Sequence, residues 1–449
     1  MFIIYNEAIE KAMREDPYIP PPDALTLTAT ADNSSVKLVK NGTLDNTYEV
    51  DTGNGWEDYA FNTVIPLNAG QSCKWRCKSH PTTQTYLNHV QFEMTGKIEA
   101  SGSCSSMLSS DFENITSLSG YDHAFYSLFN ACISLMQAPE LPATTLSDSC
   151  YNNMFRNCKS LKKAPELPAT TLSDSCYNNM FSYCRSLMQA PELPATTLTN
   201  YCYSRMFEGC SSLTQAPALP ATTLTKACYF NMFNGCTSLT QAPELPATTL
   251  EEQCYSNMFE GCTSLTQAPE LPATTLTIQC YYNMFEGCTS LEQAPELPAT
   301  TLTNYCYYGM FEGCTSLTQA PALPSTTLTN SCYSTMFYGC TSLMQAPELP
   351  ATNLATHCYR YMFYGCTSLM QAPELPATTL EERCYESMFD GCSKLNEVRI
   401  SATTTATNAL YSWLSGVATT GNFYCDPNAT IFPTGVSGIP EGWSRLPLS

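Results

Sequence analysis

Cysteine is the residue type in this chain that most plainly invites chemistry. Most of its 25 cysteines fall in two registers of a repeated segment, represented by Cys150 and Cys158. Eight residues along a short helical element would separate these two thiols by ~12 Å, which is beyond disulfide reach. Bonds between successive repeats would leave an unpaired member, because the total is odd. We therefore interpret both registers as buried thiols that act as small hydrophobic side chains in a chain folded in a reducing cytoplasm.

A second candidate for chemistry is a zinc site. The residues of the zinc-ligand type are Cys73, Cys77, His80 and His89. Between positions 72 and 78, however, apolar and basic residues alternate, as expected of a half-buried strand. On a strand the two cysteines would lie ~13 Å apart, whereas each ligand of one zinc lies ~2.3 Å from the metal. The sequence favours the strand, and we predict no metal and no cofactor.

Catalytic groups are sparse. The four histidines, at positions 80, 89, 123 and 357, have no companion Ser, Cys or carboxylate at a known nucleophile or metal spacing. The chain also shows no glycine-rich loop of the kind that cradles phosphate. We predict no catalytic residue and a protein that is not an enzyme.

The elements that position these residues come from a repeat. A segment of the form CYxxMFxGCTSLTQAPELPATTLxxx recurs every 26 residues. Its first cysteine falls at Cys150, Cys176, Cys202, Cys228, Cys254, Cys280, Cys306, Cys332, Cys358 and Cys384. Each unit is too short to bury its own apolar face, so the units must stack as a solenoid with one continuous core.

Within a unit, the apolar residues follow a helical period. In the copy that begins at Cys280 they are Cys280, Tyr281, Met284, Phe285 and Cys288. This spacing predicts two or three helical turns that face inward. The prolines at 295 and 298 cannot donate to a ladder, which limits the following strand to three or four residues. The predicted fold class is an α+β repeat solenoid with short parallel strands and short helices.

Residues 284–291 read MFEGCTSL. This core resembles the AFxGCxxL core of leucine-rich repeats of the Bacteroides surface protein A type (BspA-like), with Met in place of Ala and a longer, proline-rich return. The resemblance covers residues 124–395. It implies a leucine-rich-repeat solenoid, and it implies an adhesion or recognition protein of the kind found in gut bacteria and their phages.

The flanks differ from the repeat. We assign residues 1–22 to an amphipathic segment with a proline-rich linker, 23–103 to a small β-sandwich, 104–395 to the solenoid and 396–449 to a C-terminal cap. In the first segment Ile4, Ile9 and Met13 lie on one helical face. This face would either dock on its own domain or serve as an oligomerisation or docking peg.

Repetition also creates files of like residues on the surface. A glutamate recurs in the PELP part of most units, as in Glu244, Glu270 and Glu296, and a glutamine recurs beside it. Adjacent carboxylates ~5 Å apart in water would repel by about 1 kcal/mol per pair. The glutamate file must therefore be solvated, neutralised by cations, or matched by a cationic partner.

Positions that change between units point to recognition. Core positions are constant, while the residues after Cys-Tyr and after Met-Phe vary. The tyrosines at these positions are Tyr282, Tyr308, Tyr338 and Tyr364. Because tyrosine offers contact area at small entropic cost, we predict that these four side chains help form a binding surface.

Charge limits the class of partner. The chain has 20 Lys and Arg against 40 Asp and Glu, a net charge of −20, which disfavours nucleic acid and anionic membranes. No stretch is long enough to span a bilayer, and the first residues do not resemble a signal peptide. We predict a phage virion surface component of fibre or decoration type, which binds a protein or glycan receptor and contacts virion proteins through its N-terminus. The alternative is a bacterial cell-surface or secreted adhesin, and a homo-oligomer stays open in both.

Overall fold

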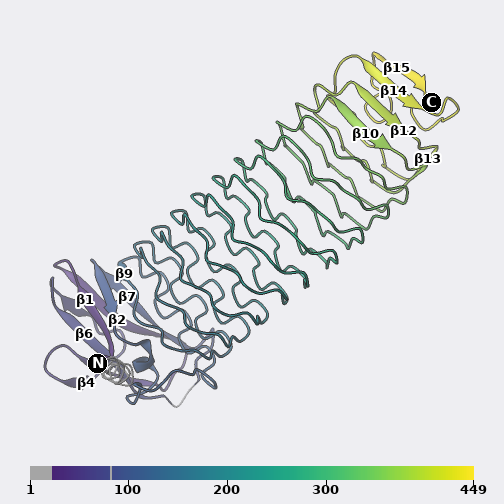
Figure 1. The fold of residues 1–449 in the computed structure, drawn as a ribbon. Coiled ribbons are helices and arrows are strands. Elements are labelled where there is room, and N and C mark those ends of the chain that lie inside the picture. The colour runs from purple at the N-terminus through teal and green to yellow at the C-terminus, as the bar shows by residue number, and fades with distance from the viewer. Residues whose placement is uncertain (1–22, 81–82, 449) are drawn as a thin grey trace, which may run out of the picture.

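The computed structural model describes residues 23–80 and 83–448. Figure 1 shows a rod of stacked coils with a group of strands at its N-terminal end and a second group at its C-terminal end. The predicted docking segment with Ile4, Ile9 and Met13 lies outside the described residues.

Two sheets form the N-terminal end. Their strands are β1 (Leu25–Ala29), β2 (Ser34–Asn41), β3 (Thr47–Asp51), β4 (Trp56–Asp58), β5 (Ile65–Leu67), β6 (Ser72–Ser79), β7 (His89–Thr95) and β8 (Ile98–Ser101). One sheet has the order β4-β3-β6-β1-β8-β9 and the other the order β5-β2-β7, with antiparallel pairing throughout except between β8 and β9. Along β6 buried and partly exposed residues alternate, so Cys73, Trp75 and Cys77 point into the core.

The first sheet continues directly into the solenoid. Strand β8 pairs in parallel with β9 (Leu135–Gln137), which belongs to the first coil. The ring of Phe92 on β7 stacks on Phe129 of that coil at a centroid distance of 5.2 Å. The N-terminal strands therefore cover the apolar end of the first coil, and the two parts share one hydrophobic core.

The coils contain no α-helix. Within residues 23–80 and 83–448 the one helical element is the short 3-10 helix η1 (Cys104–Met107). The prediction of an α+β repeat with short helices is therefore wrong, and the solenoid is built from turns and short parallel pairings. None of the described residues form a helix long and apolar enough to cross a bilayer.

The backbone hydrogen bonds explain why the helical pattern does not produce a helix. In the coil that begins at Cys280, the N–H groups of Tyr281 and Asn283 donate to carbonyls of the next coil, at 3.1 and 2.8 Å. The N–H groups between them close tight turns, as Tyr282 does by donating to the carbonyl of Gln279 at 3.3 Å. Because every second N–H leaves its own coil, the i to i−4 ladder of an α-helix cannot form.

Left-handed residues separate these turns. Gln279, Asn283 and Gly287 have φ angles of 56°, 51° and 69°, four residues apart. A residue in this region reverses the local path and stops helical propagation. Side chains at offsets 0, 1, 4, 5 and 8 still point inward, because a four-residue turn repeats at nearly the same interval as a helical turn.

The proline-rich return pairs only at single points in most coils. Isolated parallel bridges join successive glutamines, such as Gln241 to Gln267, and successive threonines, such as Thr275 to Thr301. Proline two residues after each glutamine has no N–H to donate, which interrupts the ladder. Longer pairing appears towards the C-terminal end, at β10 (Gln371–Leu375) and β11 (Thr379–Leu380).

The coil path continues beyond residue 395. Strands β12 (Glu397–Ile400), β14 (Gly421–Cys425) and β15 (Trp443–Pro447) extend β10 into a parallel sheet, and β13 (Thr404–Thr405) pairs with β11. Residues 409–415 occupy the place of the Cys-Tyr segment, since Phe389 N donates to the carbonyl of Trp413 at 3.0 Å. The buried Trp413 ring then closes the column of aromatic side chains.

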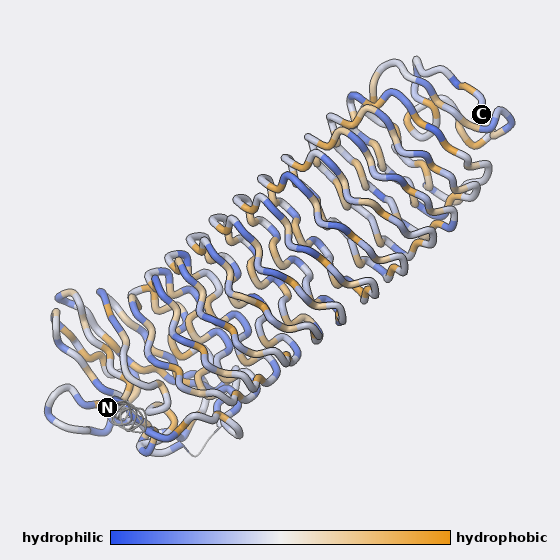
Figure 2. Tube along the Cα trace, viewed as in Figure 1, coloured by the Kyte–Doolittle hydropathy of each residue, from blue (hydrophilic) through white to orange (hydrophobic). Residues whose placement is uncertain are grey.

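The core consists of columns that run along the rod. Figure 2 shows hydrophobic positions recurring at equivalent places in successive coils. The Tyr281 ring stacks between Tyr255 and Tyr307 at 5.8 and 5.7 Å, and a phenylalanine column runs beside it. Cys288 Sγ donates to the carbonyl of Phe259 at 3.1 Å. The structure describes all 25 cysteines, and each is free and buried.

Candidate recognition surface

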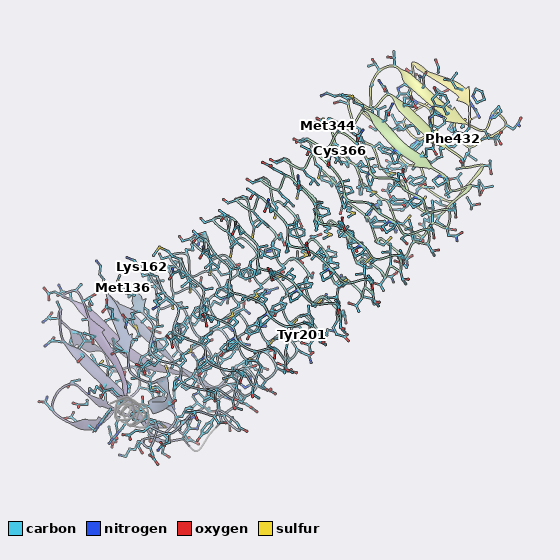
Figure 3. All side chains as sticks on the ribbon, viewed as in Figure 1. Met136, Lys162, Tyr201, Met344, Cys366 and Phe432 are labelled. Carbon is cyan, nitrogen blue, oxygen red and sulfur yellow. The ribbon has the colours of Figure 1, made fainter. Side chains whose placement is uncertain are left out.

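Three surfaces of the rod expose side chains to solvent. We call residues 281–287 and their equivalents the turn face, residues 294–298 and their equivalents the proline face, and residues 289–293 and their equivalents the loop edge. Figure 3 shows Met136, Lys162 and Met344 of the loop edge along one side of the rod and Tyr201 on the other side.

The four predicted tyrosines lie on the turn face and form two pairs. Tyr282 stacks on Tyr308 with centroids 4.8 Å apart, and Tyr338 stacks on Tyr364 at 4.7 Å. Each pair joins equivalent positions of two successive coils, and all four side chains are half-buried. Stacking holds these rings in place before any ligand arrives, so little rotamer entropy remains to be lost on binding.

A column of three carboxylates lies beside the tyrosines, and the sequence analysis did not select it. Glu260, Glu286 and Glu312 follow Met-Phe in three successive coils and are half-buried. Burial and the charges of its two neighbours raise the pKa of Glu286 to about 7. Asn257 Nδ2 donates to Glu260 Oε2 at 2.6 Å, and Asn283 Nδ2 donates to Glu286. The sequence signal that could have identified the column is that the residue after Met-Phe is glutamate in three consecutive units.

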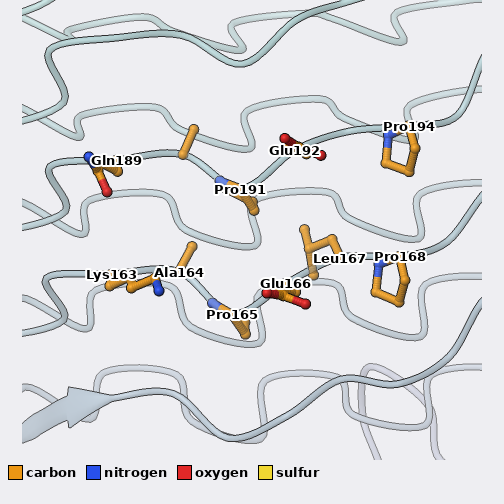
Figure 4. A pocket seen from close by; sticks show the side chains of 11 residues that line it. Lys163, Ala164, Pro165, Glu166, Leu167, Pro168, Gln189, Pro191, Glu192 and Pro194 are labelled. Atoms are coloured by element: carbon orange, nitrogen blue, oxygen red, sulfur yellow. The ribbon is translucent and has the colours of Figure 1, made fainter. Parts of the chain in front are cut away.

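The proline-face glutamates have a different environment. Glu244, Glu270 and Glu296 are exposed, which fits the solvated alternative for this file. Prolines and leucines line shallow grooves between successive coils on this face. The groove in Figure 4 has a volume of ≈ 450 Å³, and Lys163, Glu166, Gln189 and Glu192 are its polar lining. A similar groove lies near Glu296.

The zinc ligands considered in the sequence do not come together. Cys73 and Cys77 point into the core, and burial raises their pKa to about 12 and about 11. His80 and His89 lie instead against rings of the first coil, Tyr121 at 6.1 Å and Tyr126 at 5.0 Å. In the part of the chain that the structure describes, no group of three or more His, Cys, Asp or Glu is arranged to hold a metal.

The histidines mark the junction between the N-terminal sheets and the first coil. His89 Nε2 is 3.1 Å from Asn41 Nδ2. A positive charge on the neighbouring His123 would disfavour protonation of His89. Burial lowers the pKa of His80, His89 and His123. The junction is therefore built for neutral histidines, a feature that spacing along the chain does not reveal.

The basic side chains of β6, namely Lys74, Arg76 and Lys78, form a stripe whose positive charges are paired with nearby carboxylates. Arg76 Nε lies 2.7 Å from Glu49 Oε2, and its guanidinium covers the Trp56 ring at 4.3 Å. Lys78 Nζ pairs with Asp58. These contacts leave the stripe as a solvated, ion-paired sheet surface.

Comparison with known proteins identifies the repeat. A family model described as BspA type leucine rich repeat region matches this chain in six copies, over residues 84–214, 121–258, 222–334 and 310–415. A crystal structure of a TLR13-ssRNA13 complex aligns with 14% sequence identity and a TM-score of 0.23, over 68% of this chain and 51% of that chain, so this chain spans about half of its length. A TM-score of this size supports no inference about a ligand. No curated protein matches.

Proposed function

This chain belongs to the BspA-type leucine-rich repeat family, and from that premise we propose that it is a non-enzymatic recognition protein whose ligand is a protein or a glycan. Leucine-rich repeat proteins are generally binding scaffolds, and BspA-type repeats suggest interaction or adhesion. The observation that carries the proposal is the contrast between constant buried columns and a turn face that changes between coils. Between residues 260 and 364 the variable positions of the turn face carry four tyrosines and three glutamates.

The chemistry of the turn face suits a ligand with hydroxyl or cationic groups. Stacked tyrosine rings offer flat area and phenolic hydroxyls at small entropic cost. The half-buried carboxylates accept hydrogen bonds from hydroxyls and ammonium groups, and such bonds are stronger when the acceptor is charged. In this proposal residues 23–103 and 396–449 cap the apolar ends of the solenoid and keep the turn face accessible.

The test replaces the tyrosines of the turn face. A variant with Tyr282→Ser, Tyr308→Ser, Tyr338→Ser and Tyr364→Ser is compared with the unmodified chain for binding to a glycan array and to intact bacterial cells. We expect bound signal to fall at least tenfold. A control with Thr240→Ser and Thr266→Ser on the loop edge should bind normally. Equal binding by the four-tyrosine variant would remove the turn face from the proposal.

For the biological setting, we propose a virion surface component attached through its N-terminal segment. The 25 buried free thiols support folding in a reducing cytoplasm. The family match favours the second candidate, a bacterial surface or secreted adhesin. Capsid or tail genes beside the coding sequence, together with the protein in purified particles, would support the first setting. Its presence on intact bacterial cells without particles would support the second.

A further inference from the structure

Charge is distributed unevenly along the rod. Between residues 227 and 359 the chain contains no Lys or Arg. The same stretch contains Glu244, Glu251, Glu252, Glu260, Glu270, Glu286, Glu292, Glu296, Glu312 and Glu348. By contrast, the coil that begins at Cys150 has cations at four positions where other coils usually have neutral or acidic residues: Arg156, Lys159, Lys162 and Lys163.

Four cations form a basic band on the loop edge, which we define as Lys159, Lys162, Lys163 and Arg185. Lys159 and Arg185 occupy the same position of successive coils, and all four side chains are exposed. None of them belongs to an ion pair within residues 23–80 and 83–448. Unlike the stripe on β6, the band is therefore free to meet an external anion.

Exposed apolar side chains flank the basic band. Ile133 occupies the position of Lys159 in the preceding coil and is 55% exposed. Met188 occupies the position of Lys162 in the following coil and is 52% exposed. Methionine and arginine are enriched in protein interfaces. A partner that matches this surface combines carboxylates with accessible apolar side chains.

The C-terminal half of the same edge has those features. Glu292 stands in the file of Lys162, and Met344 and Met370 follow it, each 55% exposed. The two methionines line a groove of ≈ 940 Å³. Glu348 and Glu374 are exposed on the adjoining proline face. Glu166 and Glu192 hold the same proline-face register beside the basic band, so the two halves differ in their cations: residues 227–359 have no Lys or Arg to balance their carboxylates.

We propose that two copies of this chain pair side by side and antiparallel along the loop edge, with the basic band of each against the Glu292–Met370 half of the other. Parallel pairing in register would place cations against cations, whereas antiparallel pairing brings opposite charges together and covers Met344 and Met370. A two-fold arrangement of this kind is self-complementary and closed.

The size of the contact is sufficient for specific association. The edge between the coils of Ile133 and Met370 spans about nine coil steps of ~5 Å. With a width of ~12 Å, pairing would bury on the order of 1,000 Å² in total, at the lower end for a specific interface. The turn faces of both copies remain free, so a dimer would present two recognition surfaces and gain avidity.

Charge reversal tests the pairing. Sedimentation equilibrium of the full chain should show a monomer–dimer equilibrium. Either Lys159→Glu, Lys162→Glu and Lys163→Glu together, or Glu292→Lys, Glu296→Lys and Glu348→Lys together, should weaken the dimer at least tenfold. A one-to-one mixture of the two triple variants should restore it, because each reversed half then meets its complement. The control Lys37→Glu, Lys97→Glu and Lys226→Glu changes the net charge as the lysine triple does, but away from the loop edge, and should have little effect on dimerisation.

Each result decides the proposal. Restored association in the mixture also shows that both triple variants fold, since misfolded chains would not complement each other. A chain that is monomeric at every concentration would overturn the proposal, as would a dimer indifferent to both reversals. The pairing is independent of the receptor, because loss of binding in the four-tyrosine variant would leave the sedimentation result unchanged.

Discussion

Two glutamate files run along this rod, and they differ although residue type and spacing are the same. The turn-face file consists of Glu260, Glu286 and Glu312, and the proline-face file includes Glu244, Glu270 and Glu296. In the first file, burial and neighbouring charges raise the pKa of Glu286 to about 7. In the second file the carboxylates are exposed to water, which screens their repulsion. The comparison shows that the repeat sets the spacing of the carboxylates, while their burial sets the free energy of the repulsion between them.

The largest effect should come from the core below each file. Phe285 is fully buried and stacks between Phe259 and Phe311 at 5.6 and 5.7 Å. Phe285→Ala should cost about 3–5 kcal/mol of unfolding free energy, because both ring contacts are lost and a cavity remains. Leu297→Ala, below the proline face, should cost about 2–3 kcal/mol. Urea unfolding measures both, and an equal or larger loss at Leu297 would contradict the expectation that the core below the turn face contributes more to the free energy of unfolding.

The next effect concerns the turn-face carboxylates themselves. The pKa of Glu286 is raised in the folded state, so its contribution to stability is full below the ordinary glutamate pKa of 4.5 and is lost as pH rises through about 7. Glu286→Gln should therefore stabilise the protein at pH 8 by about 1–2 kcal/mol after allowance for screening. At pH 4 the variant and the unmodified chain should unfold alike. Glu296→Gln serves as the matched control, and a stabilisation that is the same at both pH values would argue against repulsion within the column.

The histidine junction provides a pH response of opposite sign. Burial lowers the pKa of His89, so its contribution is present above the ordinary histidine pKa of 6.5 and is lost as pH falls below it. We expect the protection factors of the β7 amides, which correct for the intrinsic exchange rate at each pH, to fall between pH 7 and pH 5. Residues 280–312 should become more protected over the same range. His89→Gln should flatten the response of β7 alone, and an unchanged response would assign it to another group.

The smallest effect is expected on the proline face. Replacing Glu244, Glu270 and Glu296 by glutamine together should change the free energy of unfolding by less than about 0.5 kcal/mol, because exposed substitutions away from packed features are nearly neutral. Urea unfolding at low and high salt measures this. A stabilisation of more than about 1 kcal/mol at low salt would mean that the proline-face file is as strained as the turn-face file.

The helix prediction was wrong for a reason that individual residues make clear. Inward positions such as Tyr281, Met284 and Phe285 recur at intervals shared by an α-helix and by stacked four-residue turns. The two structures differ in where Asn283 N–H donates, and its acceptor is the carbonyl of Tyr308 in the next coil. That acceptor lies 25 residues away, so a local pattern could not reveal it.

The geometry of the candidate surface could be foreseen from the sequence only in part. Variation between units selected Tyr282 and Tyr308, but their stacking depends on how the coils are aligned. The column around Glu286 was overlooked, because its register was treated only as variable. The histidine junction was also overlooked, because His89 and His123 belong to different elements.

The sequence by itself determined that 26-residue units stack, that the repeated Cys, Tyr, Met and Phe side chains line the interior, and that BspA-type repeats extend through most of the chain. Side-chain polarity and exact repetition carry that information, because burial of apolar surface acts on every unit in the same way. Only the tertiary structure decided that the coils are turns, that glutamates of one type face different environments, and that histidines gather at the junction. Each of these depends on partners in a neighbouring coil or sheet, whose distance and burial are set by packing.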